Sequence, residues 1–234
     1  MKDADREVAA LAATQVGAFS RRQAAQAGLS DEAMTRRVIT GRWELLHPSV
    51  YRLAGAPATR QQRLMAAVLW AGLSAAISHT TGAWLLQLRA VWTVDLHLTV
   101  PPSSPSRCRG LVLHRAVLTR RDVVEVDGTR CTSATRTILD CAALLTDEEL
   151  EAAFEKARRL GLTSPVALAR RAEELCGKGR PGSARVRLAW KHDRARLATL
   201  EACGWRIVHV TWDDATLEPE QTVDRIAQAL GCAA

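Results

Sequence analysis

Short apolar periods separated by glycines organise the first forty residues of the chain. Apolar side chains recur at three- and four-residue spacing from Val8, which predicts an amphipathic helix over 5–16. Two shorter helices are expected over 21–27 and 31–40, because each follows a serine that can cap its N-terminus and precedes a glycine that can end it. The first serine also forms a capping-box pattern with Gln23. Two short helices joined by a tight turn give a helix-turn-helix pattern.

Two strand-forming runs follow the third helix directly. The segments 42–46 and 50–53 flank the turn residues 47–49, which predicts a β-hairpin. A hairpin at this point of the chain stands where the wing of a winged helix-turn-helix would be. Glycine and proline at 55–57 then close the unit, which is expected to span residues 1–56.

The helix over 31–40 is expected to face a nucleic acid. Met34 and Val38 are four residues apart and should face the core, which leaves the residues between and after them facing outward, with Arg37 on the flank. An outward-facing helix can enter the major groove, where arginine reads guanine and apolar groups touch the thymine methyl. The expected DNA contacts in the helices and the wing are Arg21, Arg22, Gln23, Thr35, Arg36, Arg37, Ile39, Arg42 and Arg52.

The distribution of charge favours the same interpretation. The chain carries a formal net charge of +7, and residues 20–63 hold eight arginines against three acids, a surplus of five. Such a balance favours an anionic partner, here double-stranded DNA. The alternative is a structural winged helix that serves dimerisation and keeps its arginines solvated, although no dimer seam is visible in the pattern.

From residue 58 the pattern changes to apolar helices and alternating strands. Helices are expected over 58–77 and 79–88, and the longest uncharged apolar run, 64–77, is shorter than the roughly 20 residues that a membrane span needs. Residues 92–100 alternate apolar and polar side chains, which predicts a half-buried strand. Further strands are expected over 111–117, 123–126 and 129–132, then helices over 133–145, 147–160 and 165–176.

The C-terminal part is predicted to be a short helix-strand-helix. A glycine-rich linker over 177–183 precedes a basic helix (191–203), a strand (205–212) and a last helix (219–230). A unit of this size has too little core to be stable alone, so it must dock elsewhere. The expected fold class is therefore α+β, with a winged helix-turn-helix, a mixed α/β middle domain over 57–178 and a small tail over 184–234.

Candidate chemistry in the middle domain is sparse. Ser78 and His79 begin a helix, and Asp95 and His97 share the polar face of a strand, so a Ser/His/Asp site can be imagined. The favoured interpretation is structural: Ser78 caps the helix, His79 forms a hydrogen bond, and His97 lies on a solvated face. Nearby on the chain, Arg136 and Asp140 are expected to form a local ion pair.

Metal chemistry receives little support from the sequence. Glu125 and Asp127 could be nuclease acids on a strand, but no lysine follows on that strand, and Asp127-Gly128 suits a plain turn. None of the six cysteines belongs to a CxxC pair, and no histidine is placed to complete a zinc site with them. We therefore expect reduced thiols, no metal and no cofactor. The N-terminus does not resemble a signal peptide, which predicts a cytoplasmic location.

The order of these segments resembles a known family. Residues 7–55, through GAFSRRQAAQAGLS and TRRVITGRWELLHPSVYRLAG, resemble the winged-helix domain of AbiEi-type antitoxins of type IV toxin–antitoxin systems. The segments ISHTTGAWLLQL, VDLHLTVP and VDGTRCTSATRTILDCA resemble the domain that follows it, so the likeness covers about 1–185. The resemblance implies a winged helix that represses its own promoter and a second domain that neutralises a nucleotidyltransferase-like toxin.

The tail is similar to the C-terminal end of the DUF559 domain, a Vsr-like endonuclease fold, through HDRAR at 192–196 and GWRIVHVTWDD at 204–214. Relatives of that domain carry metal-ligating acids between the linker and the DRAR helix, whereas only 186–191 separates them here. Hydrolysis by this fold needs clustered carboxylates that hold a divalent ion. The acids Asp193, Asp213 and Asp214 do not recreate that set, so a catalytically inactive remnant is expected.

The sequence thus predicts a DNA-binding transcriptional regulator that resembles AbiEi antitoxins and has no catalytic activity. Two alternatives stay open. One is a metal-dependent DNA endonuclease of the DUF559/Vsr-like class, with acids from Glu125, Asp127 and the tail. The other is an interaction module whose main partner is a nucleotidyltransferase-like toxin.

Overall fold

The computed structural model describes residues 2–104, 107–175, 208, 210 and 219–230. The chain divides into two compact units, one formed by 1–85 with 91–132 and the other by 86–90 with 133–234. Among the described helices, none is both long and apolar enough to cross a bilayer. The predicted linker, the basic helix over 191–203 and nearly all of the strand over 205–212 fall outside the described residues.

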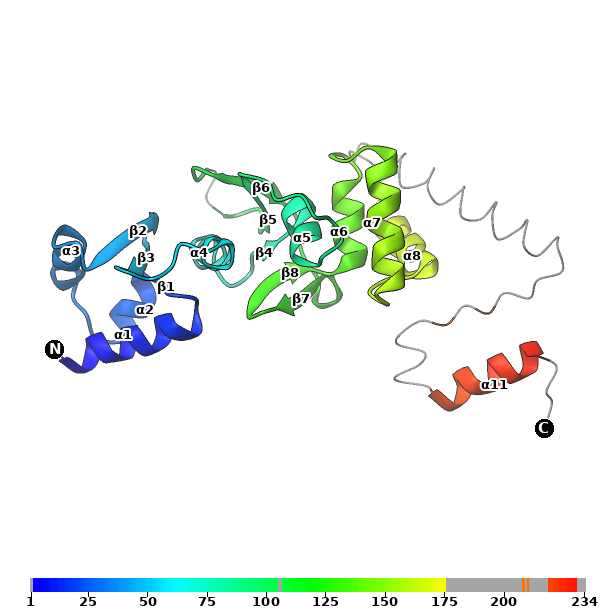
Figure 1. The fold of residues 1–234 in the computed structure, drawn as a ribbon, viewed down its shortest axis with the longest axis horizontal. Coiled ribbons are helices and arrows are strands. Elements are labelled where there is room, and N and C mark those ends of the chain that lie inside the picture. Colours follow the sequence, from blue (N-terminus) through cyan, green and yellow to red (C-terminus); the bar gives the residue numbers. More distant parts are fainter. Residues whose placement is uncertain (1, 105–106, 176–207, 209, 211–218, 231–234) are drawn as a thin grey trace. The chain divides into compact units, whose positions relative to one another are not determined.

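The first unit opens with a winged helix-turn-helix (Figure 1). The hairpin is tight: His47 pairs with Val50, and Ser49 takes a left-handed conformation in the turn (φ 63°). A short strand that the sequence analysis did not predict, β1, pairs antiparallel with the second hairpin strand and completes a three-stranded sheet in the order β1-β3-β2. The elements are α1 (Lys2–Thr14), β1 (Ala18–Ser20), α2 (Arg21–Gln26), α3 (Asp31–Ile39), β2 (Trp43–His47) and β3 (Val50–Leu53).

Aromatic packing holds the winged helix together. Phe19 of β1 lies edge-on to Trp43 of β2 with ring centroids 4.7 Å apart, and Tyr51 of β3 is 6.0 Å from the Phe19 ring. Val8 of α1 and Met34 of α3 are buried in the same cluster. Each three-turn or shorter element is too small to be stable alone, so its position depends on this shared core.

The second part of the first unit is a five-stranded mixed sheet in the order β6-β5-β4-β8-β7. Strands β5 and β6 are parallel, and β4 joins β5 antiparallel and β8 parallel. The Asp127-Gly128 turn joins β7 to β8 as predicted. The elements are α4 (Arg60–Ala71), β4 (Ala76–Ile77), α5 (His79–Leu85), β5 (Leu96–Val100), β6 (Leu111–Arg115), a 3-10 turn η1 (Arg120–Asp122), β7 (Val123–Val126) and β8 (Thr129–Thr132).

The structure corrects two predictions for this sheet. The apolar run 64–77 is not one helix, because Gly72 at φ 92° ends α4 and the chain then turns into strand β4. The strand predicted over 92–100 begins only at Leu96, and Val94 is 78% exposed. In both places apolar periodicity alone did not show where the backbone changes direction.

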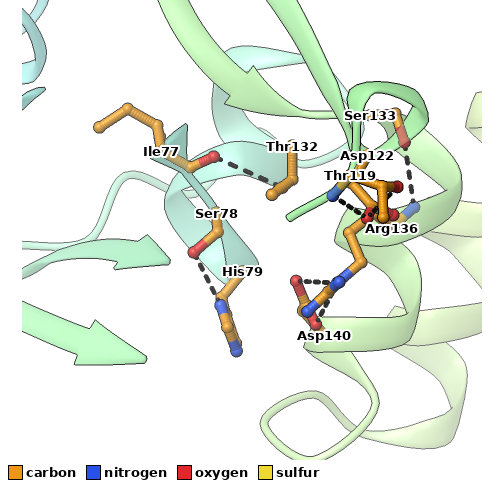
Figure 2. Close-up of polar contacts among 9 residues, drawn as sticks. All are labelled: Ile77, Ser78, His79, Thr119, Asp122, Thr132, Ser133, Arg136 and Asp140. Carbon is orange, nitrogen blue, oxygen red and sulfur yellow. Dashed lines mark hydrogen bonds and ion pairs between the residues drawn. The ribbon is translucent and has the colours of Figure 1, made fainter. Parts of the chain in front are cut away.

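The regular elements described in the second unit are all helices. The Thr146 hydroxyl accepts from the Glu149 amide while the Glu149 side chain accepts from the Thr146 amide, which confirms the predicted capping box. The predicted Arg136–Asp140 pair is also confirmed, with Nε donating to Oδ1 at 2.9 Å (Figure 2). The Arg136 side chain is buried, and the Asp140 side chain is partly buried. The helices are α6 (Ala134–Cys141), α7 (Asp147–Arg159), α8 (Pro165–Leu175) and α11 (Pro219–Leu230).

Candidate nucleic-acid interface

Helix α3 lies beside the β2–β3 hairpin (Figure 1). Its outward face carries polar, cationic and apolar side chains. Thr35, Arg36 and Ile39 are exposed, and the Ile39 side chain is 79% exposed. Met34 is buried and Val38 packs against the core, which confirms the predicted orientation of the helix. The Ser30 hydroxyl caps the helix by accepting from the Ala33 amide at 3.2 Å. A bare isoleucine beside an arginine is suited to contact with a base edge.

Arg37 lies on the opposite side of the same helix. Its Nε and Nη2 donate to the two carboxylate oxygens of Asp5 at 2.7 and 2.8 Å, and its Nη1 donates to the Ala33 carbonyl at 2.7 Å. The guanidinium also lies 5.6 Å from the Trp43 ring centroid. Of the residues expected to contact DNA, Arg37 is thus the least available, because its donors already have partners inside the domain.

Three other expected contacts are also engaged within the domain. Arg21 forms an ion pair with Asp31 at 2.8 Å, which joins the first turn of α2 to that of α3. Gln23 accepts from the Ser20 amide at 2.8 Å as the second half of the predicted capping box. Arg52 donates from Nε to Glu44 at 2.8 Å across the hairpin. Such residues can position the helices without being the main cationic contacts.

Among the residues expected to contact DNA, three arginines are exposed and form no ion pair with a described residue. They are Arg22 in the first turn of α2, Arg36 on the outer face of α3, and Arg42 just before the first wing strand. Unpaired exposed guanidinium groups retain their full charge for phosphate or base contacts. One such arginine therefore lies in α2, one in α3 and one at the start of the wing.

The imagined Ser/His/Asp site is not assembled as a triad. The Ser78 hydroxyl lies 2.9 Å from His79 Nδ1 (Figure 2), whereas Asp95 is exposed in the bend just before β5. The expectation that His97 lies on a solvated face is wrong, because its ring is half-buried against another histidine. Glu125 and Asp127 are exposed, and Asp127 (φ 47°) serves the turn between two strands.

Three histidines of the first unit form a cluster that the sequence did not reveal. His97 Nδ1 lies 3.0 Å from His114 Nε2, and the rings of His79 and His114 stack with centroids 3.4 Å apart. Burial lowers the pKa of His114 to about 4, and repulsion from the neighbouring His97 contributes to this shift. Burial also lowers the pKa of His97. The three positions lie on separate elements, so no local spacing in the sequence could reveal them.

Comparisons with known proteins bear on the winged helix and on the fold. No curated protein matches the chain. The crystal structure of the RV2827C protein from Mycobacterium tuberculosis is similar, with a TM-score of 0.55 and 15% sequence identity over 90% of this chain and 83% of that one. A likeness at this identity establishes a shared fold. Residues 6–54, which form the winged helix-turn-helix, match the model of a family described as "Transcriptional regulator, AbiEi antitoxin".

Proposed function

We propose that this protein is a sequence-specific regulator of the AbiEi-antitoxin type that binds double-stranded DNA through α3 and the wing and represses its own promoter. The observation that carries the proposal is the outer face of α3, where Arg36 and Ile39 are exposed while Met34 and Arg37 of the same helix are buried. The family match over residues 6–54 supports the same assignment.

The contacts divide by chemistry. Arg36 is assigned to a base edge, since a guanidinium can donate two hydrogen bonds to guanine, and Ile39 is assigned to a thymine methyl. Arg22 and Arg42 are assigned to phosphates on either side of the groove, where they set the register of the protein without reading sequence. Arg21 and Arg52 hold their neighbours in place through Asp31 and Glu44. Repression follows if such binding occludes the promoter.

No catalytic step is part of the proposal. The acids considered for a nuclease, Glu125 and Asp127, are exposed on a strand and its turn and belong to no cluster suited to a metal within the described residues. The middle domain and the tail are assigned instead to a protein partner, a nucleotidyltransferase-like toxin, in keeping with the antitoxin description of the family.

A fluorescence-anisotropy titration of the full chain against its own upstream DNA, with magnesium present and random-sequence competitor, tests the proposal. Arg36→Ala should weaken binding to the specific site by about 1–3 kcal/mol while binding to random DNA changes little. The matched control is Arg159→Ala, an exposed arginine in the last turn of α7, which should leave both affinities unchanged. Equal affinity of the wild-type protein for specific and random DNA would overturn the regulator assignment.

Two further outcomes separate the alternatives. Cleavage of the DNA in magnesium, lost in Asp127→Ala, would contradict the absence of catalysis and support an endonuclease. DNA that stays intact and unbound would overturn the DNA-binding part of the proposal. A stable complex between this chain and a toxin encoded beside it would, in that case, still support the antitoxin part.

A further inference from the structure

Two adjacent strands of the five-stranded sheet and the helix that follows a third bring one histidine each to the same place. His97 lies on β5 and His114 on β6, while His79 is the first residue of α5 and is separated from β4 by Ser78 alone. Each ring offers one nitrogen, and these three nitrogens all lie within 4.8 Å of one another. In the described residues, no other group of three histidine, cysteine, aspartate or glutamate ligands comes this close together.

Strand register explains the convergence. Strands β5 and β6 are parallel, and His114 pairs with Thr99, which lies two residues beyond His97 on the same face of β5. Diagonal neighbours on adjacent strands are within reach of long side chains. On the other side of β5, the Ser78 amide donates to the His97 carbonyl at 2.9 Å, which places the start of α5 against the same strand.

His79 is held in an uncommon backbone conformation. Its φ of 52° lies in the left-handed region, which is rare for residues other than glycine. The Ser78 hydroxyl lies 2.9 Å from His79 Nδ1. A hydrogen bond of this kind fixes the tautomer and the ring orientation of a histidine that binds a metal ion through its other nitrogen.

We propose that His79, His97 and His114 bind a divalent transition-metal ion, with Zn²⁺ as the preferred species. Imidazole nitrogen is a ligand that suits zinc, and three protein ligands leave a fourth tetrahedral position for water or an external donor. The inference is independent of the DNA-binding proposal, since none of these residues lies in the helix-turn-helix or the wing.

The distances between the three ring nitrogens can reach those of a tetrahedral zinc site through movement of the side chains alone. Nitrogens around a tetrahedral zinc ion are about 3.4 Å apart when each metal–nitrogen distance is about 2.1 Å. The 3.0 Å between His97 Nδ1 and His114 Nε2 and the 4.8 Å limit for the whole set bracket that spacing. On binding, the proton shared between these two nitrogens moves to a ring nitrogen that faces away from the ion. The stacked rings of His79 and His114 must then tilt apart.

A buried hydroxyl beside the cluster could accept a hydrogen bond from, or donate one to, a water in the fourth position. Thr99 lies on the same face of β5 as His97 and pairs with His114, and its Oγ1 is buried with no hydrogen-bond partner in the described structure. A buried hydroxyl without a partner is uncommon because its desolvation is uncompensated. A metal-bound water would supply that partner.

Cobalt(II) titration of the chelator-treated, dialysed full-length protein tests the site. We expect one ion per chain with the visible d–d absorption of tetrahedral cobalt, and competition by Zn²⁺. His97→Asn and His114→Gln are the informative variants, because an amide can keep a hydrogen bond at the position of Nδ1 or Nε2 but is a poor zinc ligand. Both should lose the absorption and keep the wild-type circular-dichroism spectrum.

The matched control is His47→Asn, since His47 is a half-buried histidine of the wing that lies outside the cluster. It should bind cobalt as the wild type does. Ser78→Ala should lower the affinity by about 10- to 100-fold without abolishing it. Thiolate-to-cobalt charge-transfer bands, unchanged binding in the two cluster variants, or no bound ion at all would overturn the proposal.

Discussion

Arg37 and Asp5 form a two-pronged ion pair that fastens α3 to α1, with Nε to Oδ1 at 2.7 Å and Nη2 to Oδ2 at 2.8 Å. The neighbouring Arg36 is exposed and has no such partner in the described residues. Two consecutive arginines on one helix therefore have separate roles. Arg36 is exposed for contact with a ligand, whereas Arg37 fixes the orientation of α3 relative to α1.

This difference predicts opposite phenotypes for two similar substitutions. Arg37→Ala should lower the local free energy of unfolding by about 1.5–3 kcal/mol, since it removes charge-assisted hydrogen bonds and the contact with Trp43. Arg36→Ala should change stability by less than about 0.5 kcal/mol, as is usual for exposed positions. Hydrogen exchange of the peptides that cover α1 and α3 measures both effects. Equal protection in the two variants would contradict the assignment.

The same pair predicts a dependence on pH. The hydrogen bond from Arg37, with smaller contributions from the charges of Arg37 and Arg42, lowers the pKa of Asp5 below its ordinary 3.8. A carboxyl whose pKa is lower in the folded state stabilises fully above its unfolded pKa, and that contribution disappears as the pH falls through the folded value.

Asp5→Asn provides the measurement. The variant should be less stable than the wild type near neutral pH, and the difference should shrink as the pH falls from about 5 to about 2, because the wild-type carboxyl then becomes protonated as well. Exchange protection of α1 at several pH values follows this convergence. A difference that stays constant with pH would show that the Asp5 charge does not stabilise the domain.

Local features of the winged helix could be predicted from the sequence because they depend on residues close together in the chain. The capping box of Ser20 and Gln23, the serine cap of α3 and the hairpin turn at Ser49 each involve groups within a few positions of one another. The orientation of α3 also follows from a period of 3.6 residues.

The features that the sequence did not predict mostly depend on contacts between residues far apart in the chain. Arg37 is buried because it meets Asp5, 32 positions away, and the helical period alone placed it only on the flank. The histidine cluster arises from the register of β4, β5 and β6, which joins positions 79, 97 and 114. Strand β1, only three residues long, carries too little periodic signal to be recognised.

Gly17 provides a test of packing between the winged helix and the segment that follows it. Its φ is +83°, and a Cβ at this position would lie 2.8 Å from the Ala56 Cβ and 3.0 Å from Gln62 Nε2, which itself donates to the Val16 carbonyl. Gly17→Ala should therefore combine backbone strain with a steric clash, destabilising the first unit by about 2–5 kcal/mol.

Gly28, in the turn between α2 and α3, is the matched control. Its φ of +89° is similar, but an added Cβ would meet nothing within 4 Å. Gly28→Ala should cost only the strain, about 1–2 kcal/mol. Thermal denaturation of the two variants compares them, and equal losses would show that the contact with Ala56 and Gln62 does not constrain Gly17.

The salt dependence of DNA binding separates the arginines of the wing. Arg42 is exposed and unpaired in the described structure, whereas the charge of Arg52 is already offset by Glu44 at 2.8 Å. Each phosphate contact releases condensed counterions, so Arg42→Ala should reduce the slope of log K against log salt by about 1. Arg52→Ala should reduce it by clearly less, because little net charge leaves the interface.

Titrations of both variants and of Arg159→Ala with one DNA duplex at several salt concentrations measure these slopes. The control should keep the wild-type slope, since Arg159 belongs to a helix of the second unit. A slope that falls equally for Arg42 and Arg52 would mean that the Arg52–Glu44 pair opens on binding and that both arginines contact phosphate. An unchanged slope for Arg42 would remove it from the interface and confine the cationic contacts to α2 and α3.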